Sequence, residues 1–369
     1  MKLTIQKEQL LNGLQAVQNI VVARTTLPVL SNVLLRAEGN RLEMTTTNLD
    51  VTISCSVEAT VLEPGSATVP VKRFFGIARE LPAAEIQIEF DERNACSLQA
   101  GAAFYKIHGL PADDFPPLPQ FAEEHKVLLP QDKVRVLLRR TSYASSMDEA
   151  RYVLNGIFFS IKEHKMTLVA TDGRRLALAE EDVEVPAENQ AEFIVPSKAI
   201  NELTRLLQPG GEMEICSKGN QAAFRMKDVK GFTTLLITKL VEGNYPNYRQ
   251  VIPSETKERI ALGREELLQA LHRSEFMTSD KANSVKLNFT KNNLTITANA
   301  QDVGEGRESI AVNYGGKDIS IAFNPGYMMD PLRILEADEV YLELSDELSP
   351  GLLKVNEPFL YVLMPMRTN

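Results

Sequence analysis

The chain has 369 residues, 44% of them hydrophobic, and a formal net charge of −9. This length suits two or three globular domains, each able to bury a core. A net negative charge is unusual for a nucleic-acid-binding protein, and the sequence contains neither an apolar leader nor an apolar run long enough to cross a membrane, so we expect a cytoplasmic protein with no membrane contact.

A pattern of about 125 residues occurs three times. Related segments lie at 45–50, 170–176 and 296–302, and again at 69–75, 195–201 and 323–329. Each unit is longer than a solenoid repeat and long enough to be a domain. We therefore predict three similar domains, 1–125, 126–253 and 254–369.

The first repeat begins with a short alternating strand and continues as an amphipathic helix at 9–20. A hairpin around Gly39 and a long strand at 49–61 follow, the latter closed by Pro64-Gly65. Cys55 lies on the apolar side of that strand and is expected to be a reduced core thiol. A second helix begins after Pro70, and three strands are predicted at 85–90, 95–100 and 103–108. The pattern predicts an α+β domain made of two β-α-β-β-β units.

The later repeats follow the same order. Helices are predicted at 133–143, 198–207, 265–274 and 326–336. Proline-rich stretches at 115–119 and 243–253 mark the linkers. The terminal segment alternates from Tyr361 and contains Pro365, which suggests an edge strand, with an ordinary final strand as an equal alternative.

Charge is segregated by element. Acidic residues concentrate in predicted strands and loops, such as 180–182 and 336–347, whereas two predicted helices are basic. The basic helix residues are Lys72, Arg73 and Arg79 after Pro70, and Lys133, Arg135, Arg139 and Arg140 in the helix at 133–143.

The sequence offers little support for catalysis. It has no nucleotide-binding motif, no clustered metal ligands and no paired cysteines, so we expect no cofactor and no metal site. Asp113-Asp114 could form part of a two-metal site, but its proline-rich surroundings favour a solvated turn. Asp172-Gly173 is interpreted as a type I′ turn at a hairpin corner and not as a catalytic aspartate.

Several longer motifs resemble one family. They are Thr-Leu-Pro-Val-Leu-Ser-Asn (26–32), Leu-Pro-Ala-Asp-Asp-Phe-Pro (110–116), Arg-Tyr-Val-Leu-Asn-Gly (151–156), Ala-Thr-Asp-Gly-Arg-Arg-Leu-Ala (170–177) and Tyr-Val-Leu-Met-Pro-Met-Arg (361–367). Together they make the whole chain similar to the bacterial DNA polymerase III beta subunit, the sliding clamp. The resemblance implies three tandem clamp domains per chain, with two chains joined head to tail as a dimeric ring and helices lining the hole. It implies a non-catalytic processivity factor that encircles double-stranded DNA regardless of sequence.

The resemblance also implies which residues face DNA. A ring needs only weak, sequence-blind phosphate contacts, because its topology prevents escape. By family position these residues are Arg24, Lys72, Arg151, Tyr152 and Lys198. Helix charge alone adds Arg139, Arg140 and Arg205, for which a solvated helix face is the alternative.

Partners of this family dock a short linear motif in an apolar pocket, and they include the replicative polymerase, the clamp loader and repair proteins. Carried over by position, the pocket consists of Leu154, Thr171, Gly173, Arg175, Leu176, Pro246, Val251, Asn324, Tyr327, Val362, Met364, Pro365, Met366 and Arg367. Two positions depart from the family, since Arg174 stands where a histidine is common and Gln250 where an arginine is frequent. These departures bear on motif preference.

The homodimer contact is expected where the strand containing Tyr105 and Ile107 meets the region of Phe276 and Met277 in the partner. Pairing two edge strands satisfies their free hydrogen-bonding groups. The family's edge is often rich in arginine, whereas this chain has Ala102-Ala103-Phe104 there, so we predict an apolar interface with Arg73 as its main cation.

Two other functions compete with a clamp. A metal-dependent nuclease would use Asp113 and Asp114, and its cleavage of DNA would require a divalent cation. A scaffold built on the same repeats would bind peptides but would not be retained on circular DNA.

Overall fold

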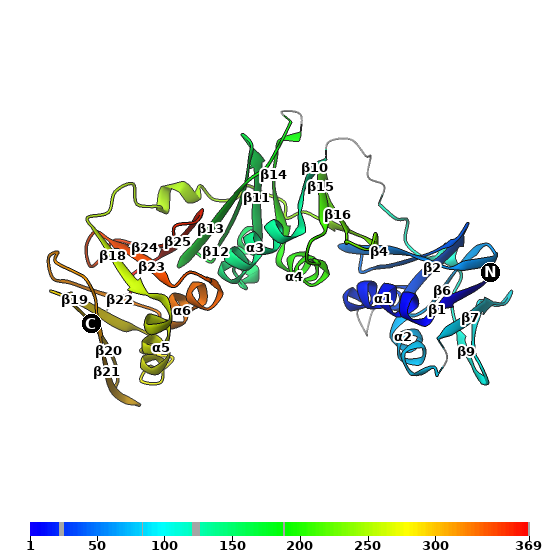
Figure 1. Cartoon of the computed structure of the whole chain (residues 1–369), viewed down its shortest axis with the longest axis horizontal. Helices are drawn as coiled ribbons and strands as arrows, with labels where there is room; N and C mark the ends of the chain where they lie inside the picture. The colour runs from blue at the N-terminus through cyan, green and yellow to red at the C-terminus, as the bar shows by residue number, and fades with distance from the viewer. Residues whose placement is uncertain (22–25, 83, 120–125, 187–188, 368–369) are drawn as a thin grey trace. The chain divides into compact units, whose positions relative to one another are not determined.

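The computed structural model describes residues 1–21, 26–82, 84–119, 126–186 and 189–367 (Figure 1). Arg24, expected to face DNA, lies outside this part of the chain. The chain forms two compact units: unit 1 comprises Met1–Arg135 and Lys198–Leu240, and unit 2 comprises Val136–Ser197 and Val241–Asn369. Within the described ranges, no helix is long and apolar enough to cross a membrane.

The first third of the chain contains the β-α-β-β-β unit twice, as predicted. Its elements are β1 (Lys2–Gln6), α1 (Lys7–Val17), β2 (Asn32–Glu38), β3 (Arg41–Thr47), β4 (Val51–Glu58), the additional strand β5 (Thr60–Glu63), β6 (Gly65–Pro70), α2 (Val71–Glu80), β7 (Glu85–Phe90), β8 (Ala95–Ala100) and β9 (Ala103–His108). The single strand predicted for 49–61 is therefore wrong. The ladder breaks at Ala59, whose N–H donates to the Asn40 carbonyl at 3.0 Å, and β5 then pairs with β1 in a different sheet.

In the part of the chain that the structure describes, the remaining two thirds repeat this order without an additional strand. The second third contains β10 (Val127–Pro130), α3 (Gln131–Thr141), β11 (Gly156–Lys162), β12 (Lys165–Thr171), β13 (Arg175–Asp182), β14 (Ala191–Pro196), α4 (Ser197–Leu206), β15 (Glu212–Lys218), β16 (Gln221–Lys227) and β17 (Thr233–Lys239). The last third contains β18 (Glu258–Gly263), α5 (Arg264–Glu275), β19 (Val285–Thr290), β20 (Asn293–Ala300), β21 (Gly304–Ala311), β22 (Ile319–Phe323), α6 (Pro325–Ile334), β23 (Glu339–Leu344), β24 (Gly351–Lys354) and β25 (Phe359–Leu363).

The two motifs of each third exchange their leading strands, which the sequence pattern did not predict. β1 joins the sheet of β7, β8 and β9, while β6 joins that of β2, β3 and β4. The same exchange places β10 beside β15, β14 beside β11, β18 beside β23, and β22 beside β19. Because each motif completes the sheet of the other, neither motif is a separate folding unit.

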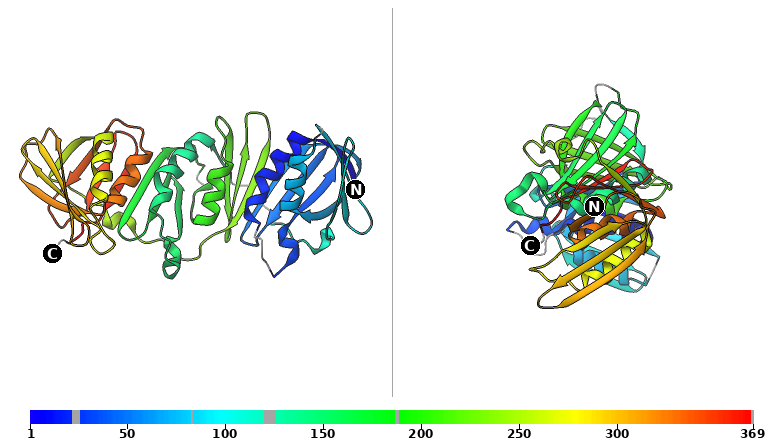
Figure 2. Two further views of the ribbon diagram at one scale, coloured as in Figure 1. Left: turned by 90° about the horizontal axis from the view of Figure 1, so that it is seen from below. Right: turned by 90° about the vertical axis from the view of Figure 1, so that its left-hand side faces the viewer.

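Unit 1 is built around an eight-stranded sheet in the order β10-β15-β16-β17-β4-β3-β2-β6. Helices α1 and α2 of this unit, both blue in the left view of Figure 2, lie side by side. Helix α1 packs closely on this sheet at Gly13, where a Cβ atom would lie 1.9 Å from the Met44 Cε atom. Cys55 lies beside Gly13 and is buried, as predicted. Burial raises the pKa of its thiol to about 12, so the group stays protonated and packs as a small apolar side chain.

Unit 2 contains a second eight-stranded sheet, β14-β11-β12-β13-β25-β24-β23-β18, and the smaller sheet β21-β20-β19-β22. The edge position predicted for the C-terminal strand is wrong, because β25 pairs with β13 on one side and β24 on the other. Pro365 lies beyond the strand, so its missing N–H removes no ladder bond. The C-terminal strand therefore holds the middle of this sheet.

Candidate functional site

A hairpin corner between β12 and β13 is organised by the Asp172 carboxylate. Its Oδ1 atom accepts hydrogen bonds from the backbone N–H groups of Arg174 (2.8 Å) and Arg175 (3.1 Å). The Thr171 hydroxyl accepts from the Gly173 N–H at 3.1 Å and donates to the Arg175 carbonyl at 2.6 Å. The turn prediction is confirmed, but a type I′ turn is wrong. Thr171 pairs with Leu176 across a four-residue loop in which Gly173 has a positive φ of 84° and Asp172 does not.

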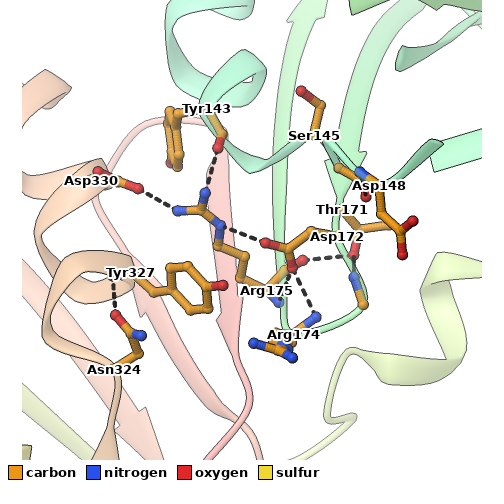
Figure 3. Close-up of polar contacts among 12 residues, drawn as sticks. Tyr143, Ser145, Asp148, Thr171, Asp172, Arg174, Arg175, Asn324, Tyr327 and Asp330 are labelled. Carbon is orange, nitrogen blue, oxygen red and sulfur yellow. Dashed lines mark hydrogen bonds and ion pairs between the residues drawn. The ribbon is translucent and has the colours of Figure 1, made fainter. Parts of the chain in front are cut away.

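Arg175 connects this corner to helix α6 (Figure 3). Its Nε atom donates to Asp172 Oδ2 at 3.1 Å, one terminal nitrogen pairs with Asp330, and the other donates to the Tyr143 carbonyl at 2.6 Å. The guanidinium carbon lies 4.3 Å from the centre of the Tyr327 ring, a cation–π distance. The side chain is 10% exposed.

The electrostatics of this cluster keep Arg175 charged. Burial lowers the pKa of Arg175, but the neighbouring Tyr361 and Asp330 raise it by more than burial lowers it. The net shift of the pKa is therefore upward. Burial also raises the pKa of the Tyr361 hydroxyl, which donates to the Tyr327 carbonyl at 2.8 Å. A neutral tyrosine and a permanent cation therefore both contact Tyr327, the first at its carbonyl and the second at its ring.

Apolar side chains lie next to this polar cluster. Val169, Leu176, Tyr248, Leu352 and Val362 form a buried cluster, and Phe158 stacks on Tyr245 at its margin with 5.0 Å between ring centres. Exposed apolar groups are found on the segments that border the cluster. These are Val251, which is 45% exposed, Met364 at 42% and Met366 at 38%.

The C-terminal segment runs between the hairpin corner and the start of α6. The Met364 N–H donates to the Arg174 carbonyl at 3.0 Å, and the Met366 N–H donates to the Ala322 carbonyl at 2.8 Å. Asn324 caps α6, because its Oδ1 atom accepts from the Tyr327 N–H at 3.1 Å. The backbone of both methionines is thus held by hydrogen bonds, while their side chains stay exposed.

All fourteen residues expected to bind peptides belong to unit 2. Leu154, Leu176 and Val362 are buried; Thr171, Arg175, Asn324, Tyr327 and Pro365 are half-buried; Gly173, Pro246, Val251, Met364, Met366 and Arg367 are exposed. We call this set, with Arg174, the docking site. Sequence reasoning missed Tyr143, Asp330 and Tyr361 as its supports, because nothing in their local sequence indicates that they meet Arg175.

The residues expected to face DNA differ in whether their side chains already have partners in the chain. Lys72 in α2 and Lys198 in α4 are exposed and form no ion pair with any described residue. Arg151 and Tyr152 are exposed as well, in the 3-10 helix Glu149–Leu154. Arg151 donates to Asp148 Oδ2 and to the Asp172 carbonyl, both at 3.0 Å.

The three arginines chosen from helix charge alone have partners within their own units. Arg139 pairs with Glu336 at 3.4 Å, and Arg140, 16% exposed, pairs with Glu357. Arg205 donates to the carbonyls of Gln15 (3.1 Å) and Ala16 (2.6 Å) near the C-terminal end of α1. Each of the three side chains is therefore already engaged by a partner in its own unit.

The expected dimer residues lie at or near open edges of two sheets. β9 is the edge of the sheet β5-β1-β7-β8-β9, where Phe104 is 58% and Tyr105 47% exposed, whereas the Ile107 side chain is buried in its own unit. β21 is the edge of the small sheet in unit 2. Phe276, just after α5, is 66% exposed, and Met277 packs over Gly306 of β21.

Asp113 and Asp114 occupy a short 3-10 helix, Ala112–Asp114, in a surface loop. Among the described residues, no group of three or more histidine, cysteine, aspartate or glutamate side chains could hold a metal ion. Nothing in this geometry supports the nuclease alternative.

Comparison with known proteins identifies the family of this chain. Profiles of the N-terminal, central and C-terminal domains of the DNA polymerase III beta subunit match residues 1–119, 128–247 and 249–367. The chain is 35% identical to the beta sliding clamp of Chlamydia muridarum over 367 residues, covering 100% of this chain and 99% of that one. It is 36% identical to the Pseudomonas putida beta sliding clamp over 372 residues, with both chains fully covered.

Solved structures agree over the same length. The DNA polymerase III subunit beta of Pseudomonas aeruginosa matches with a TM-score of 0.93 and 35% identity, covering 100% of both chains. The Bacillus subtilis DNA polymerase sliding clamp matches with a TM-score of 0.94 and 29% identity, again over 100% of both. A Pseudomonas aeruginosa sliding clamp bound to griselimycin matches with a TM-score of 0.93. The chain therefore belongs to the DNA polymerase III beta subunit family, the DNA sliding clamps.

Proposed function

We propose that this sliding clamp acts as a closed, head-to-tail homodimer that holds double-stranded DNA and has no catalytic activity of its own. The observation that carries the proposal is the match of all three consecutive domains, at full length, to sliding clamps. A clamp loader would have to open the ring, because a closed ring cannot thread onto circular DNA. Since its partner is the chromosome, the protein would work in the cytoplasm.

The DNA contacts would be weak and independent of sequence. Lys72 and Lys198 are exposed amines on helices without a described ion pair, so they are free to meet phosphate oxygens. Arg24, Arg151 and Tyr152 are the other candidates by family position. A lysine contacts a phosphate as a flexible point charge, which permits sliding and makes retention dependent on salt.

The docking site would recruit the replicative polymerase, the clamp loader and repair proteins through short segments with apolar anchors. Val251, Met364 and Met366 offer exposed apolar surface beside the buried cluster around Leu176. Methionine side chains adapt to different partners because they are unbranched and polarizable. This arrangement suits one site that serves several partners in turn.

We also propose domain boundaries near residues 125 and 253. Each domain would then contain two β-α-β-β-β motifs, with the leading strands exchanged between them. These boundaries would lie where one pair of motifs ends and the next begins. They would not match the limits of the two compact units, because β17 and β4 are neighbours in one continuous sheet.

Loading onto nicked circular DNA with a compatible clamp loader and ATP tests encirclement. Retention on circles, followed by release after the DNA is cut once, is the expected result, because only a topological link depends on closed ends. Equal retention on circular and linear DNA would instead indicate ordinary binding. No retention, with the loader active on another clamp, would favour the scaffold alternative.

The double variant Lys72→Glu/Lys198→Glu probes the proposed DNA contacts in the same assay. We expect it to form a ring but to load less efficiently and to leave circles at lower salt. Lys291→Glu/Lys317→Glu, which reverses two exposed lysines in the loops of the small sheet, is the charge-matched control. Equal behaviour of the two variants would contradict the assignment of Lys72 and Lys198.

A further inference from the structure

We infer that Arg174 makes the docking site select partner segments that carry a carboxylate beside their apolar anchors. This inference rests on the proposed peptide-docking function and adds the chemistry of the preferred partner. It depends on three features of the site: Arg174 is held in place, the neighbouring acids are already engaged, and the adjacent Arg175 is not available.

The backbone of Arg174 is fixed while its side chain is exposed. Its N–H donates to Asp172 Oδ1 at 2.8 Å, and its carbonyl accepts from the Met364 N–H at 3.0 Å. The residue therefore lies directly across from Met364, one of the exposed apolar groups of the docking site. In Figure 3 the Arg174 side chain lies apart from the cluster that surrounds Arg175. Among the residues that the structure describes, none forms an ion pair with it.

The carboxylates around this position are occupied by their own neighbours. Asp172 accepts the two backbone N–H bonds of the corner and the Arg175 Nε bond. Asp330 is shared between Arg175 and Arg333. Asp148 accepts from the Ala150 N–H at 3.0 Å and pairs with Arg151 at 3.0 Å. These acids therefore have little capacity left to neutralise Arg174.

Arg175 cannot supply the recognition cation without disrupting the site. Each of its three nitrogens already donates to a described acceptor, and its side chain is 10% exposed. Arg174 and, three residues beyond Met364, the exposed Arg367 are the cations left free among the described residues of the C-terminal segment and the hairpin corner. Free cations beside saturated acids are complementary to an acidic ligand. Arg175 thus stabilises the site, whereas the adjacent Arg174 is free to bind a partner.

Selection from a displayed library of random heptapeptides tests the inference. The library is selected in parallel on the wild-type chain, on Arg174→Gln and on the exposed control Lys291→Gln. We expect wild type and the control to enrich apolar anchors with Asp or Glu at one fixed distance from them. Arg174→Gln should enrich the same anchors without the acid. Arg174→Lys, which restores the charge, should recover the acid preference in part.

The affinity of one enriched peptide then gives the size of the effect. We expect the Asp form to bind wild type about two- to fivefold more tightly than its Asn form, the range for an exposed ion pair, and the difference to vanish in Arg174→Gln. Amidated and free-acid forms of each peptide distinguish a side-chain carboxylate from a terminal one. Apolar anchors without an acid in the wild-type selection would overturn this inference alone. Absence of any apolar anchor would overturn the docking proposal itself.

Discussion

Two hairpin corners of the fold, one in each unit, are built from the same hydrogen bonds. Asn48 Oδ1 accepts from the N–H groups of Asp50 (3.1 Å) and Val51 (2.8 Å), as Asp172 does in the second repeat. The Thr47 hydroxyl accepts from the Leu49 N–H at 3.1 Å, as Thr171 does from Gly173. The repeats differ at the residue with positive φ, which is Leu49 (76°) in one corner and Gly173 in the other.

Replacing Leu49 by glycine is therefore expected to stabilise unit 1. A left-handed backbone costs a leucine about 1–3 kcal/mol, and the side chain is 46% exposed, so little packing is lost. After the entropy cost of glycine, the expected gain is about 0.5–1 kcal/mol. Urea unfolding measures it. Leu62→Gly, on the exposed but extended strand β5, should destabilise instead, and a loss in both variants would contradict the argument.

Replacing Arg175 by methionine should destabilise unit 2. The change leaves the Tyr143 carbonyl without its donor and Asp330 with Arg333 alone, and loss of one partner of a buried ion pair costs about 3–5 kcal/mol. The unfolding midpoint in urea should fall accordingly. Arg174→Met removes an exposed arginine next in sequence and should change the midpoint little. Similar losses in the two variants would show that Arg175 does not hold the site together.

At the scale of elements, Asp91 ties the turn between β7 and β8 to the edge strand β9. Its carboxylate pairs with Lys106 and accepts the N–H groups of Ala95 and Arg93, all at 2.9 Å. The bond from Lys106, followed by that from Ala95, lowers the pKa of Asp91 from 3.8 to about 2. A lowered folded-state pKa stabilises the fold above the unfolded value and ceases to do so as the pH falls through the folded value.

The stability difference between wild type and Asp91→Asn should consequently be constant at neutral pH and shrink between pH 4 and pH 2. Urea midpoints measured at each pH give that difference, and the other carboxylates cancel because both proteins contain them. Asp50→Asn, whose carboxylate pairs with Lys239 at the surface, is the control. A difference between wild type and Asp91→Asn that did not vary with pH would contradict the lowered pKa.

Because β25 lies in the middle of its sheet, we expect three C-terminal truncations to have different outcomes. Ending the chain after Pro358 removes the strand between β13 and β24, and unit 2 should not fold. Ending it after Leu363 keeps the sheet but removes the exposed methionines, so the protein should fold and lose partner peptides. Ending it after Arg367 should change neither property. Circular dichroism and peptide binding distinguish the three, and a folded chain ending at Pro358 would disprove the role of β25.

Element order could be predicted from sequence more fully than sheet membership. Apolar periodicity, Pro70 and the turn residues fixed the helices and the three strands at 85–90, 95–100 and 103–108. Periodicity is local, however, and cannot reveal that leading strands exchange or that β25 is central, since these depend on pairing between distant segments. The proposed docking residues were available only through family resemblance. Tyr143 and Asp330, which hold Arg175 in place, could be identified only from contacts in the structure.

At the scale of the whole molecule, the proposed ring would close through apolar edges. Phe104, Tyr105, Phe276 and Val303 expose large side chains at the two regions expected to meet in the dimer. Glu308 of β21 is already held by Arg273 through two bonds of 2.8 Å, which lowers the pKa of the glutamate. Arg73 on α2 remains an exposed cation. The exposed Asp302 and Glu305 lie beside Arg307 on the β21 hairpin, so the net charge left there for an ionic interface is small.

Dimer dissociation should therefore depend weakly on salt. Raising NaCl from 50 to 500 mM is expected to change the dissociation constant by less than about threefold, because few charges are involved. Phe276→Ala should weaken the dimer by at least tenfold, the effect of losing about 1.4 kcal/mol of apolar contact. Sedimentation velocity measures both, with Leu348→Ala, an exposed leucine elsewhere, as control. A steep salt dependence would indicate ionic contacts instead.

The pairing of β4 with β17 has a consequence for synthesis on the ribosome. Residue 58 leaves the exit tunnel about 175 residues before residue 233, the start of its neighbouring strand. At about 5–20 residues per second, β4 waits roughly 9–35 s with one side unpaired. During that interval the nascent chain displays a free strand edge that can pair with other chains. Slow translation of residues 198–240 would therefore lower the yield of folded protein without any change in its final stability.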